Sequence, residues 1–176
     1  MTETLSPTLP PAVEHKVETV LRIACAESLT LATAESCTGG LFASVLTDVD
    51  GRAHAFERGF VTYTDQAKAQ VLGVPATLLE SQGAVSAPVA RAMAEGAVRA
   101  SEADIALSVT GFAGRGAPDD EAGLVFLAVA RRDGPVTVTE HHFGDVGRGA
   151  VRIACLDAGL DMLLATLGHG DDRPPD

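Results

Sequence analysis

The sequence predicts an α/β protein, a three-layer α/β/α sandwich built on a mixed sheet. Helix-like and strand-like segments alternate in the early part of the chain, which is typical of parallel strands joined by crossover helices. Later, Asp133-Gly134 lies between two β-branched runs and predicts an antiparallel hairpin. The chain has 176 residues, 46% of them hydrophobic, so one domain of this length can bury a substantial core.

The elements of the first half follow from local signals. Apolar residues recur at helical spacing from Ala12, and β-branched runs predict strands. Gly73 followed by Pro75 is a typical helix stop. The expected elements are a helix over 12–29, a strand over 29–33, a helix opened by Gly39-Gly40 that ends near residue 47, a strand over 55–62, and a helix that is capped by Thr64 or Asp65 and ends at Gly73.

The second half is expected to begin with a short helix over 75–82. Ser86 is a typical helix cap, and Pro88 is tolerated in a first turn because its missing N–H has no partner there. A glycine-rich loop over 111–123 precedes the hairpin. The remaining expected elements are a helix over 87–100, a strand over 105–110, strands over 124–130 and 136–143, and a helix from about 147 to 167.

We expect a single domain over 12–168 between two flexible segments. Residues 1–11 are rich in Thr and Pro and lack the basic and apolar regions of a signal peptide, and 169–176 form an acidic tail. No apolar run is long enough to span a membrane. The three cysteines have no Cys-x-x-Cys and no metal-site spacing, which fits a reducing cytoplasm. The net charge of −11 argues against direct nucleic-acid binding.

The segment 34–40 (Ala-Glu-Ser-Cys-Thr-Gly-Gly) is the first candidate for a catalytic site. It follows a strand and precedes a helix, so the Ser36 hydroxyl is expected at an exposed turn. The amides of Thr38, Gly39 and Gly40 would lie where helical N–H groups lack partners, and they can stabilise an oxyanion. The alternative is that these residues only cap the helix. Neither the Gly-x-Ser-x-Gly elbow nor the Walker pattern is present.

Polar residues also follow the next two strands. Tyr63 follows the second strand, and Thr110 with Gly111 ends the third. Because the carboxyl ends of parallel strands meet at one edge of a sheet, these residues can converge with Ser36. A serine needs a base to become a nucleophile, and Lys68 is suited to this role if burial keeps its amine neutral. The alternative is a solvated lysine on a helix surface.

Other reactive residues fit a site less well. None of the five histidines lies near a serine-bearing turn. Cys37 is a rival nucleophile, but no His or Cys partner is evident for it, which favours a buried thiol. Arg148 and Arg152 are four residues apart and share one helix face, where they bind a phosphate or carboxylate unless the face is simply solvated.

Several motifs occur in order between residues 12 and 168. They are Ala-Glu-Ser-Cys-Thr-Gly-Gly-Leu over 34–41, Gly-Phe-Val-Thr-Tyr-Thr-Asp-Gln-Ala-Lys over 59–68, Leu-Gly-Val over 72–74, Gly-Ala-Val-Ser over 83–86 followed by Ala-Met-Ala-Glu-Gly over 92–96, Val-Thr-Gly-Phe-Ala-Gly over 109–114, and Phe-Gly-Asp over 143–145 with Arg148 and Arg152. Together they resemble the CinA C-terminal domain family, the nicotinamide-nucleotide amidohydrolases. The resemblance implies a three-layer α/β/α fold.

The resemblance also implies an activity. Members of the family hydrolyse the carboxamide of nicotinamide mononucleotide to nicotinic acid mononucleotide and ammonia, in pyridine nucleotide salvage, without a metal or cofactor and usually as homodimers. It implies Ser36 as nucleophile, Lys68 as general base, Tyr63 as a hydrogen-bonding assistant, and Thr110 as the residue that orients the substrate or oxyanion. The residues expected to bind the nucleotide are Thr38, Gly39, Gly40, Gly111, Gly114, Arg115 and Arg148.

The loop after Thr110 departs from the family pattern. Arg115 replaces a proline, and the acidic residues 119–121 replace a Lys-Pro pair, so these carboxylates would repel a phosphate unless Arg115 compensates. The second N-terminal domain of many relatives is also missing from the sequence, which suggests a stand-alone form. The alternative function is a non-catalytic nucleotide-binding or interaction domain associated with competence or DNA damage. A weaker alternative is an amidase for another small pyridine or nucleotide amide.

Overall fold

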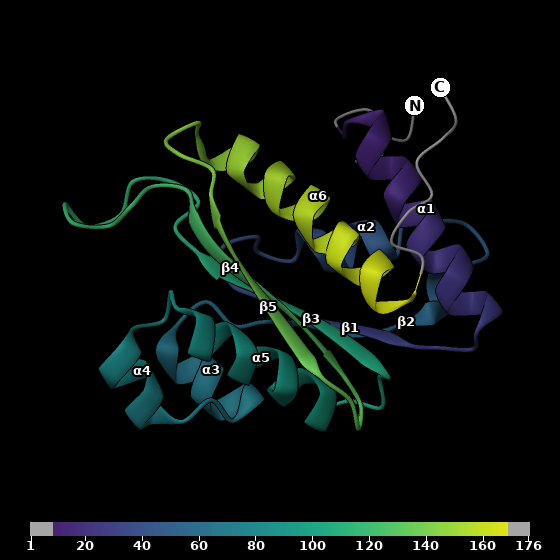
Figure 1. The fold of residues 1–176 in the computed structure, drawn as a ribbon, viewed down its shortest axis with the longest axis horizontal. Helices are drawn as coiled ribbons and strands as arrows, with labels where there is room; N and C mark the ends of the chain where they lie inside the picture. Colours follow the sequence, from purple (N-terminus) through teal and green to yellow (C-terminus); the bar gives the residue numbers. More distant parts are fainter. Residues whose placement is uncertain (1–8, 169–176) are drawn as a thin grey trace.

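A five-stranded sheet lies between two layers of helices (Figure 1), as the sequence predicts. The computed structural model describes residues 9–168. The strands are β1 (Leu31–Glu35), β2 (Phe56–Val61), β3 (Ile105–Gly111), β4 (Leu124–Arg131) and β5 (Val136–His142). The helices are α1 (Pro11–Ala26), α2 (Leu41–Leu46), the 3-10 turn η2 (Ala53–Ala55), α3 (Asp65–Leu72), α4 (Ala76–Gln82), α5 (Ala87–Arg99) and α6 (Arg148–Thr166).

The sheet is mixed and has the strand order β2-β1-β3-β4-β5. Strand β1 is central and runs parallel to both β2 and β3, whereas β4 and β5 are antiparallel additions. Glu35, the last residue of β1, pairs with Val61 on one side and Val109 on the other. The residues that follow, Thr62, Ser36 and Thr110, therefore lie in a row across three adjacent strands. The expected convergence is confirmed for Ser36 and Thr110, whereas Thr62 occupies the place in the row that was expected for Tyr63.

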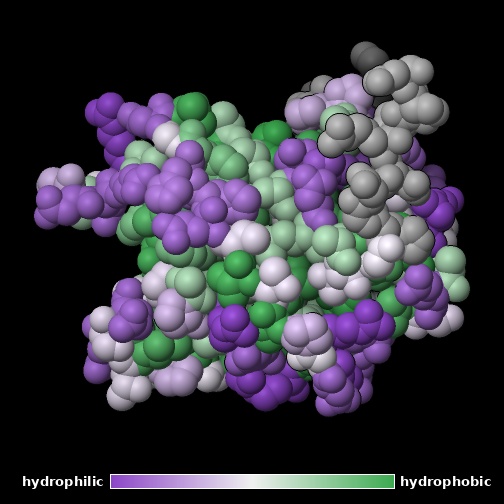
Figure 2. Space-filling model, in the orientation of Figure 1, coloured by the Kyte–Doolittle hydropathy of each residue, from purple (hydrophilic) through white to green (hydrophobic). Residues whose placement is uncertain are grey.

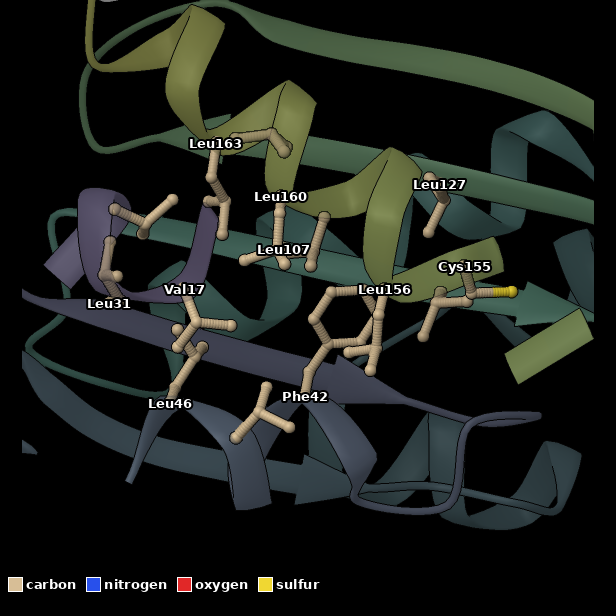
Figure 3. Close-up of a cluster of buried hydrophobic side chains, with 14 of the residues drawn as sticks. Val17, Leu31, Phe42, Leu46, Leu107, Leu127, Cys155, Leu156, Leu160 and Leu163 are labelled. Carbon is tan, nitrogen blue, oxygen red and sulfur yellow. The ribbon is translucent and has the colours of Figure 1, made fainter. Parts of the chain in front are cut away.

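The two faces of the sheet carry different cores. Large hydrophobic side chains from α1, α2 and α6 pack on one face, as Figure 3 shows for Val17, Phe42 and Leu160. On the other face, alanines of the sheet meet alanines of α5, and α3 and α4 flank this helix (Figure 1). Small side chains permit close approach, so α3 and α5 come near enough to place a lysine of α3 against the strand ends.

Most predicted boundaries agree with the structure within one or two residues, but the first strand begins later than expected. The first helix ends at Ala26 rather than near residue 29, and Ser28 then takes a left-handed φ of 56°. The amide of Thr30 is bound by the carboxylate of Asp104 at 2.8 Å, and regular pairing starts at Leu31. This shift makes Ser36 the first residue after β1.

Of the two predicted helix caps, Thr64 and Ser86, only Thr64 caps its helix through its side chain. Thr64 caps α3 as predicted, because its hydroxyl accepts a hydrogen bond from the Ala67 amide at 3.1 Å. Ser86 occupies the N-cap position of α5, but its hydroxyl donates to the Gly83 carbonyl instead of accepting from the helix.

Residues 1–8 and 169–176 lie outside the described part of the chain, while Pro11 already belongs to α1. Within 9–168, no helix is both long and apolar enough to cross a membrane.

The contact between α3 and α5 yields a prediction for stability. A Cβ atom on Gly96 of α5 would overlap the Leu72 carbonyl group at the end of α3. Gly96→Ala is therefore expected to lower the free energy of unfolding by about 1–3 kcal/mol, because the backbone of α3 must move. Urea denaturation measures this change. Gly149→Ala on α6 is the matched control, since nothing lies within 4 Å of the added methyl group. An equal loss in both variants would contradict the packing argument.

Candidate active site

Ser36 and Lys68 are in direct contact. The Lys68 Nζ lies 3.1 Å from the Ser36 Oγ, although the residues are 32 positions apart. Ser36 follows β1 at the sheet edge, and Lys68 lies on α3, which the chain reaches directly after β2. The Lys68 side chain is only 1% exposed and Ser36 is 7% exposed. Of the two interpretations of Lys68, the solvated helix lysine is wrong.

The surroundings of Lys68 favour a neutral amine. Burial removes water from the group and lowers its pKa from the ordinary 10.5, while the negative charges of Asp65 and of a Cys37 thiolate act in the opposite direction. The Nζ donates to the carbonyl of Thr62 at 3.0 Å and to that of Tyr63 at 3.3 Å. A neutral amine has two hydrogens, so these two acceptors can take both of them. The nitrogen lone pair then faces the hydroxyl of Ser36.

Tyr63 and Thr110 lie beside this pair but do not bond to it through their side chains. The Tyr63 side chain is 64% exposed, and Lys68 contacts the residue through its carbonyl. The Thr110 hydroxyl donates to the Ala84 carbonyl at 2.7 Å, so only its lone pairs remain for a ligand. Among the described residues, the buried Thr62 Oγ1 has no hydrogen-bond partner. The row of hydroxyls therefore retains unused hydrogen-bonding capacity.

The amides that were expected to bind an oxyanion are largely occupied. The Gly39 amide donates to the Ser36 carbonyl at 3.2 Å, and the Gly40 amide donates to the Glu35 carboxylate at 3.0 Å. The Thr38 hydroxyl also donates to Glu35, at 2.7 Å. Of these three amides, only that of Thr38 has no hydrogen-bond partner in the described part of the chain. Both glycines adopt left-handed conformations, with φ of 66° and 95°.

Glu35 is a site residue whose importance the sequence reasoning missed. In the sequence, Glu35 is only one member of the segment 34–40, and no role is predicted for it. A carboxylate shortly before a predicted helix is a known stabiliser of helix N-termini, and this signal was present in the sequence. Its side chain is completely buried between β1 and α2.

The arginines occupy three different positions. Arg115 forms an ion pair with Asp145, with 2.7 Å between Nη2 and Oδ2. Its loop projects from the left of the molecule in Figure 2 as a hydrophilic arm. Arg148 reaches Gly114, and its Nη2 lies 3.7 Å from where a Cβ on that glycine would sit. Arg152 contacts the serine turn directly, because its Nε donates to the Cys37 carbonyl at 2.9 Å.

The structure gives Gly111 and Gly39 packing roles in place of the substrate-binding roles expected for them. Gly111 is needed for close packing against β4, since an added Cβ would lie 2.7 Å from Val125 Cγ2. Gly39 allows the guanidinium of Arg152 to lie over the turn, with Nη2 3.4 Å from the position of a Cβ. The sequence singles out Arg152 by its spacing from Arg148 and by its place in the family motifs. Its contact with a residue 115 positions earlier could not be inferred from that spacing.

Cys37 faces away from the Ser36–Lys68 pair. Its side chain belongs to the core on the α6 side of the sheet, where it has a thiol neighbour, Cys155. The absence of a cysteine partner was thus a wrong expectation. The hydrogen bond between the two thiols lowers the pKa of Cys37 and raises that of Cys155. Because successive residues point to opposite faces of a strand, Cys37 cannot replace Ser36 as the residue next to Lys68.

Other possible sites lie apart from the pair. Within residues 9–168, no group of three or more His, Cys, Asp or Glu is placed to hold a metal ion. His142 lies at the end of β5 and is bound to Glu121 at 2.6 Å, which raises the pKa of its imidazole. An open groove of about 580 Å³ runs beside α5 between Pro75, Pro88 and Val138, and it includes neither Ser36 nor Lys68.

Known proteins are similar to this chain in sequence and in fold. The model of a family described as the CinA C-terminal domain matches residues 13–167. The chain belongs to the CinA C-terminal domain family. A putative competence-damage inducible protein of Symbiobacterium thermophilum is 51% identical over 127 residues, covering 71% of this chain and 28% of that protein. A CinA-like protein of Geobacter sulfurreducens is 47% identical over 150 residues, covering 84% of this chain and 36% of that protein.

A solved structure extends the comparison to three dimensions. The competence/damage inducible protein CihA from Agrobacterium tumefaciens superposes with a TM-score of 0.87 and 41% sequence identity, covering 91% of this chain and 98% of that one. A CinA superfamily protein from Escherichia coli gives a TM-score of 0.81 with 35% identity, covering 88% and 90% of the two chains. The chain thus spans about a third of the curated CinA-like relatives but nearly the whole of these structures.

The lowered pKa of Lys68 predicts a pH dependence of stability. Between its folded pKa and 10.5, the unfolded chain binds more protons at this residue than the folded chain does. The stability that Lys68 contributes therefore rises with pH across this range. We expect the difference in free energy of unfolding between the wild type and Lys68→Met to grow in favour of the wild type as pH increases from 7 towards 10.5. Urea denaturation at several pH values measures this difference.

Lys16 provides the matched control. Burial lowers its pKa, but the hydrogen bonds and the negative charges of Asp157 and Asp161 together raise it by more, so the net shift is upward. A raised folded pKa leaves the contribution of Lys16 constant below 10.5. The difference between the wild type and Lys16→Met should stay flat over the same pH range. A flat difference for Lys68→Met as well would mean that the Lys68 amine is not destabilised by burial.

Proposed function

We propose that this domain hydrolyses the carboxamide of nicotinamide mononucleotide to nicotinic acid mononucleotide and ammonia, in pyridine nucleotide salvage. The observation that carries the proposal is the contact between the Ser36 hydroxyl and the buried Lys68 amine. A serine paired with a neutral amine is an activated nucleophile of the kind that attacks amides. The motifs that resemble the nicotinamide-nucleotide amidohydrolases supply the identity of the substrate.

The proposed reaction begins with proton transfer from Ser36 to Lys68. The Ser36 oxygen attacks the amide carbon, and the carbonyl oxygen becomes an oxyanion. The Lys68 ammonium then gives its proton to the leaving nitrogen, the C–N bond breaks and ammonia departs. Water attacks the resulting ester while Lys68 again accepts a proton. Collapse of this second intermediate releases the acid and returns the proton to Ser36.

The oxyanion in this scheme is assigned to the Thr38 amide. Of the three amides expected to bind the oxyanion, this N–H is the one for which no described residue is an acceptor, and the Arg152 guanidinium beside the Cys37 carbonyl adds positive potential. Amide donors of this kind contribute on the order of 3 kcal/mol each to transition-state stabilisation. The helix dipole of α2 contributes little, because the carboxylate of Glu35 already lies at its N-terminus.

The substrate carboxamide and phosphate are assigned to separate groups. Since Thr110 has committed its only proton to Ala84, its oxygen can accept from the carboxamide NH2 but cannot donate to an oxyanion. The phosphate is assigned to Arg148 next to Gly114, because this arginine is exposed and reaches the loop after β3. Arg115 is paired with Asp145, so it offsets the acidic residues of the loop only in part.

Ser36→Ala and Lys68→Met should each lower the rate of ammonia release from nicotinamide mononucleotide by on the order of 10³-fold or more, because the nucleophile and its base act as a unit. A coupled assay for ammonia measures the rate, and circular dichroism checks that the variants are folded. Ser81→Ala and Lys16→Met are matched controls, since Ser81 is exposed on α4 and Lys16 pairs with Asp157 on the opposite layer. Both controls should retain wild-type rates.

Full activity in folded Ser36→Ala would contradict the mechanism. Calorimetric binding of the nucleotide by the wild type without ammonia release would instead favour the non-catalytic interaction domain. Ammonia release from another pyridine carboxamide, but not from the mononucleotide, would retain the chemistry and change the substrate.

A further inference from the structure

The carboxylate of Glu35 collects an unusual number of hydrogen bonds for a single side chain. It is 0% exposed, and both of its oxygens are used. Its donors are the Thr33 hydroxyl at 3.3 Å, the Thr38 hydroxyl at 2.7 Å, and the amides of Gly40 at 3.0 Å, Phe42 at 3.1 Å and Ala43 at 2.8 Å. A buried carboxylate is tolerated when donors surround it in this way.

These bonds close the turn that contains the candidate nucleophile. Ser36 immediately follows Glu35, while Thr38 and Gly40 return to bind the carboxylate. The left-handed Gly39 and Gly40 give the chain the curvature that this return requires. The ends of the turn are thus fixed from one side by β1 and from the other by α2, and Ser36 lies between them.

Glu35 cannot itself take part in proton transfer. Neighbouring residues of a strand point to opposite faces, so Glu35 faces α2 whereas Ser36 faces α3 and Lys68. Its oxygens are filled by donors, and none of these donors is Ser36 or Lys68. Glu35 is also not one of the causes that shift the pKa of Lys68, which are burial, Asp65 and Cys37.

We propose that Glu35 is a positioning residue for the reaction, acting through Thr38 and Gly40. It holds the Ser36 oxygen against the Lys68 amine and aims the free Thr38 amide at the oxyanion. The inference rests on the proposed function, because it requires Ser36 to be the nucleophile. Displacing a reacting group by 1 Å costs about 100-fold in rate, so a turn with such tight bonding has a direct kinetic consequence.

The test compares Glu35→Gln, Thr38→Val and Thr38→Ser with the wild type. Glutamine keeps the size of the side chain but turns an NH2 group towards amide donors, so we expect kcat to fall about 100-fold with KM nearly unchanged. Thr38→Val removes one donor and should lose about 10-fold in kcat, and Thr38→Ser should recover most of that loss because it restores the hydroxyl. Glu80→Gln, on the exposed side of α4, is the control for loss of a carboxylate.

Two further measurements separate positioning from loss of structure. In Glu35→Gln, kcat should change at the same pH as in the wild type, where Lys68 titrates, because Glu35 does not shift the pKa of Lys68. A fluorophosphonate that labels activated serines should label every molecule of Glu35→Gln at Ser36, but more slowly than in the wild type. Mass spectrometry gives both the labelled fraction and its rate.

A wild-type kcat in Glu35→Gln overturns the inference. So does a loss of rate that matches a loss of labelled fraction, since this shows damage to the fold rather than misplacement of Ser36. A wild type that labels at Ser36 but does not act on nicotinamide mononucleotide refutes the proposed substrate, and the labelling rates then still decide the role of Glu35. A wild type that neither labels nor releases ammonia overturns both proposals.

Discussion

The contact between the Lys68 amine and the Ser36 hydroxyl depends on the order of three elements. Parallel pairing of β1 and β2 brings the ends of both strands to one edge of the sheet. The Thr64 cap then starts α3 so soon after β2 that Lys68 folds back over the carbonyls of Thr62 and Tyr63. Close packing of α3 on the alanine-rich α5 excludes water from the amine. Loss of any of these features would return Lys68 to solvent and to its ordinary protonated state.

The turn after β1 divides its functions between the two faces of the sheet. Ser36 faces α3, where its partner is the base, whereas Glu35 and Cys37 face α2 and α6, where their partners are structural. This division follows from strand periodicity, since adjacent side chains alternate between faces. The residues that fix the turn, Glu35 and Cys37, therefore lie on the opposite face of the sheet from the Ser36 hydroxyl and do not occupy the side next to Lys68. Arg152 completes the support by tying α6 to the Cys37 carbonyl.

Much of the fold and the central pair could be predicted from sequence, because these features have local signals. Alternating patterns predicted the mixed sheet, and strand ends predicted that Ser36, Tyr63 and Thr110 can converge. Lys68 was a candidate base on the next helix, with a solvated lysine as the alternative. The unpredicted features depend on the relative placement of distant elements. The Arg152–Cys37 contact spans 115 positions, and the Tyr63 side chain points outward although its carbonyl binds Lys68. Glu35 had a local signal, a carboxylate shortly before a helix. Only the structure shows that Thr38 and Gly40, which follow Ser36 in the chain, donate hydrogen bonds to this carboxylate.

The geometry around Lys68 suits both protonation states that the proposed reaction requires. In the neutral state, the two N–H groups are used by the carbonyls of Thr62 and Tyr63, which leaves the lone pair for the Ser36 hydroxyl 3.1 Å away. After proton transfer, the same two carbonyls remain bound, and the third N–H points at the oxygen that has just attacked. No group has to reorient between these states, so the arrangement is preorganised for proton transfer in both directions. A histidine in this position would offer one nitrogen to the serine and would need a separate partner to orient its ring, whereas the lysine is oriented by backbone carbonyls that the fold already supplies.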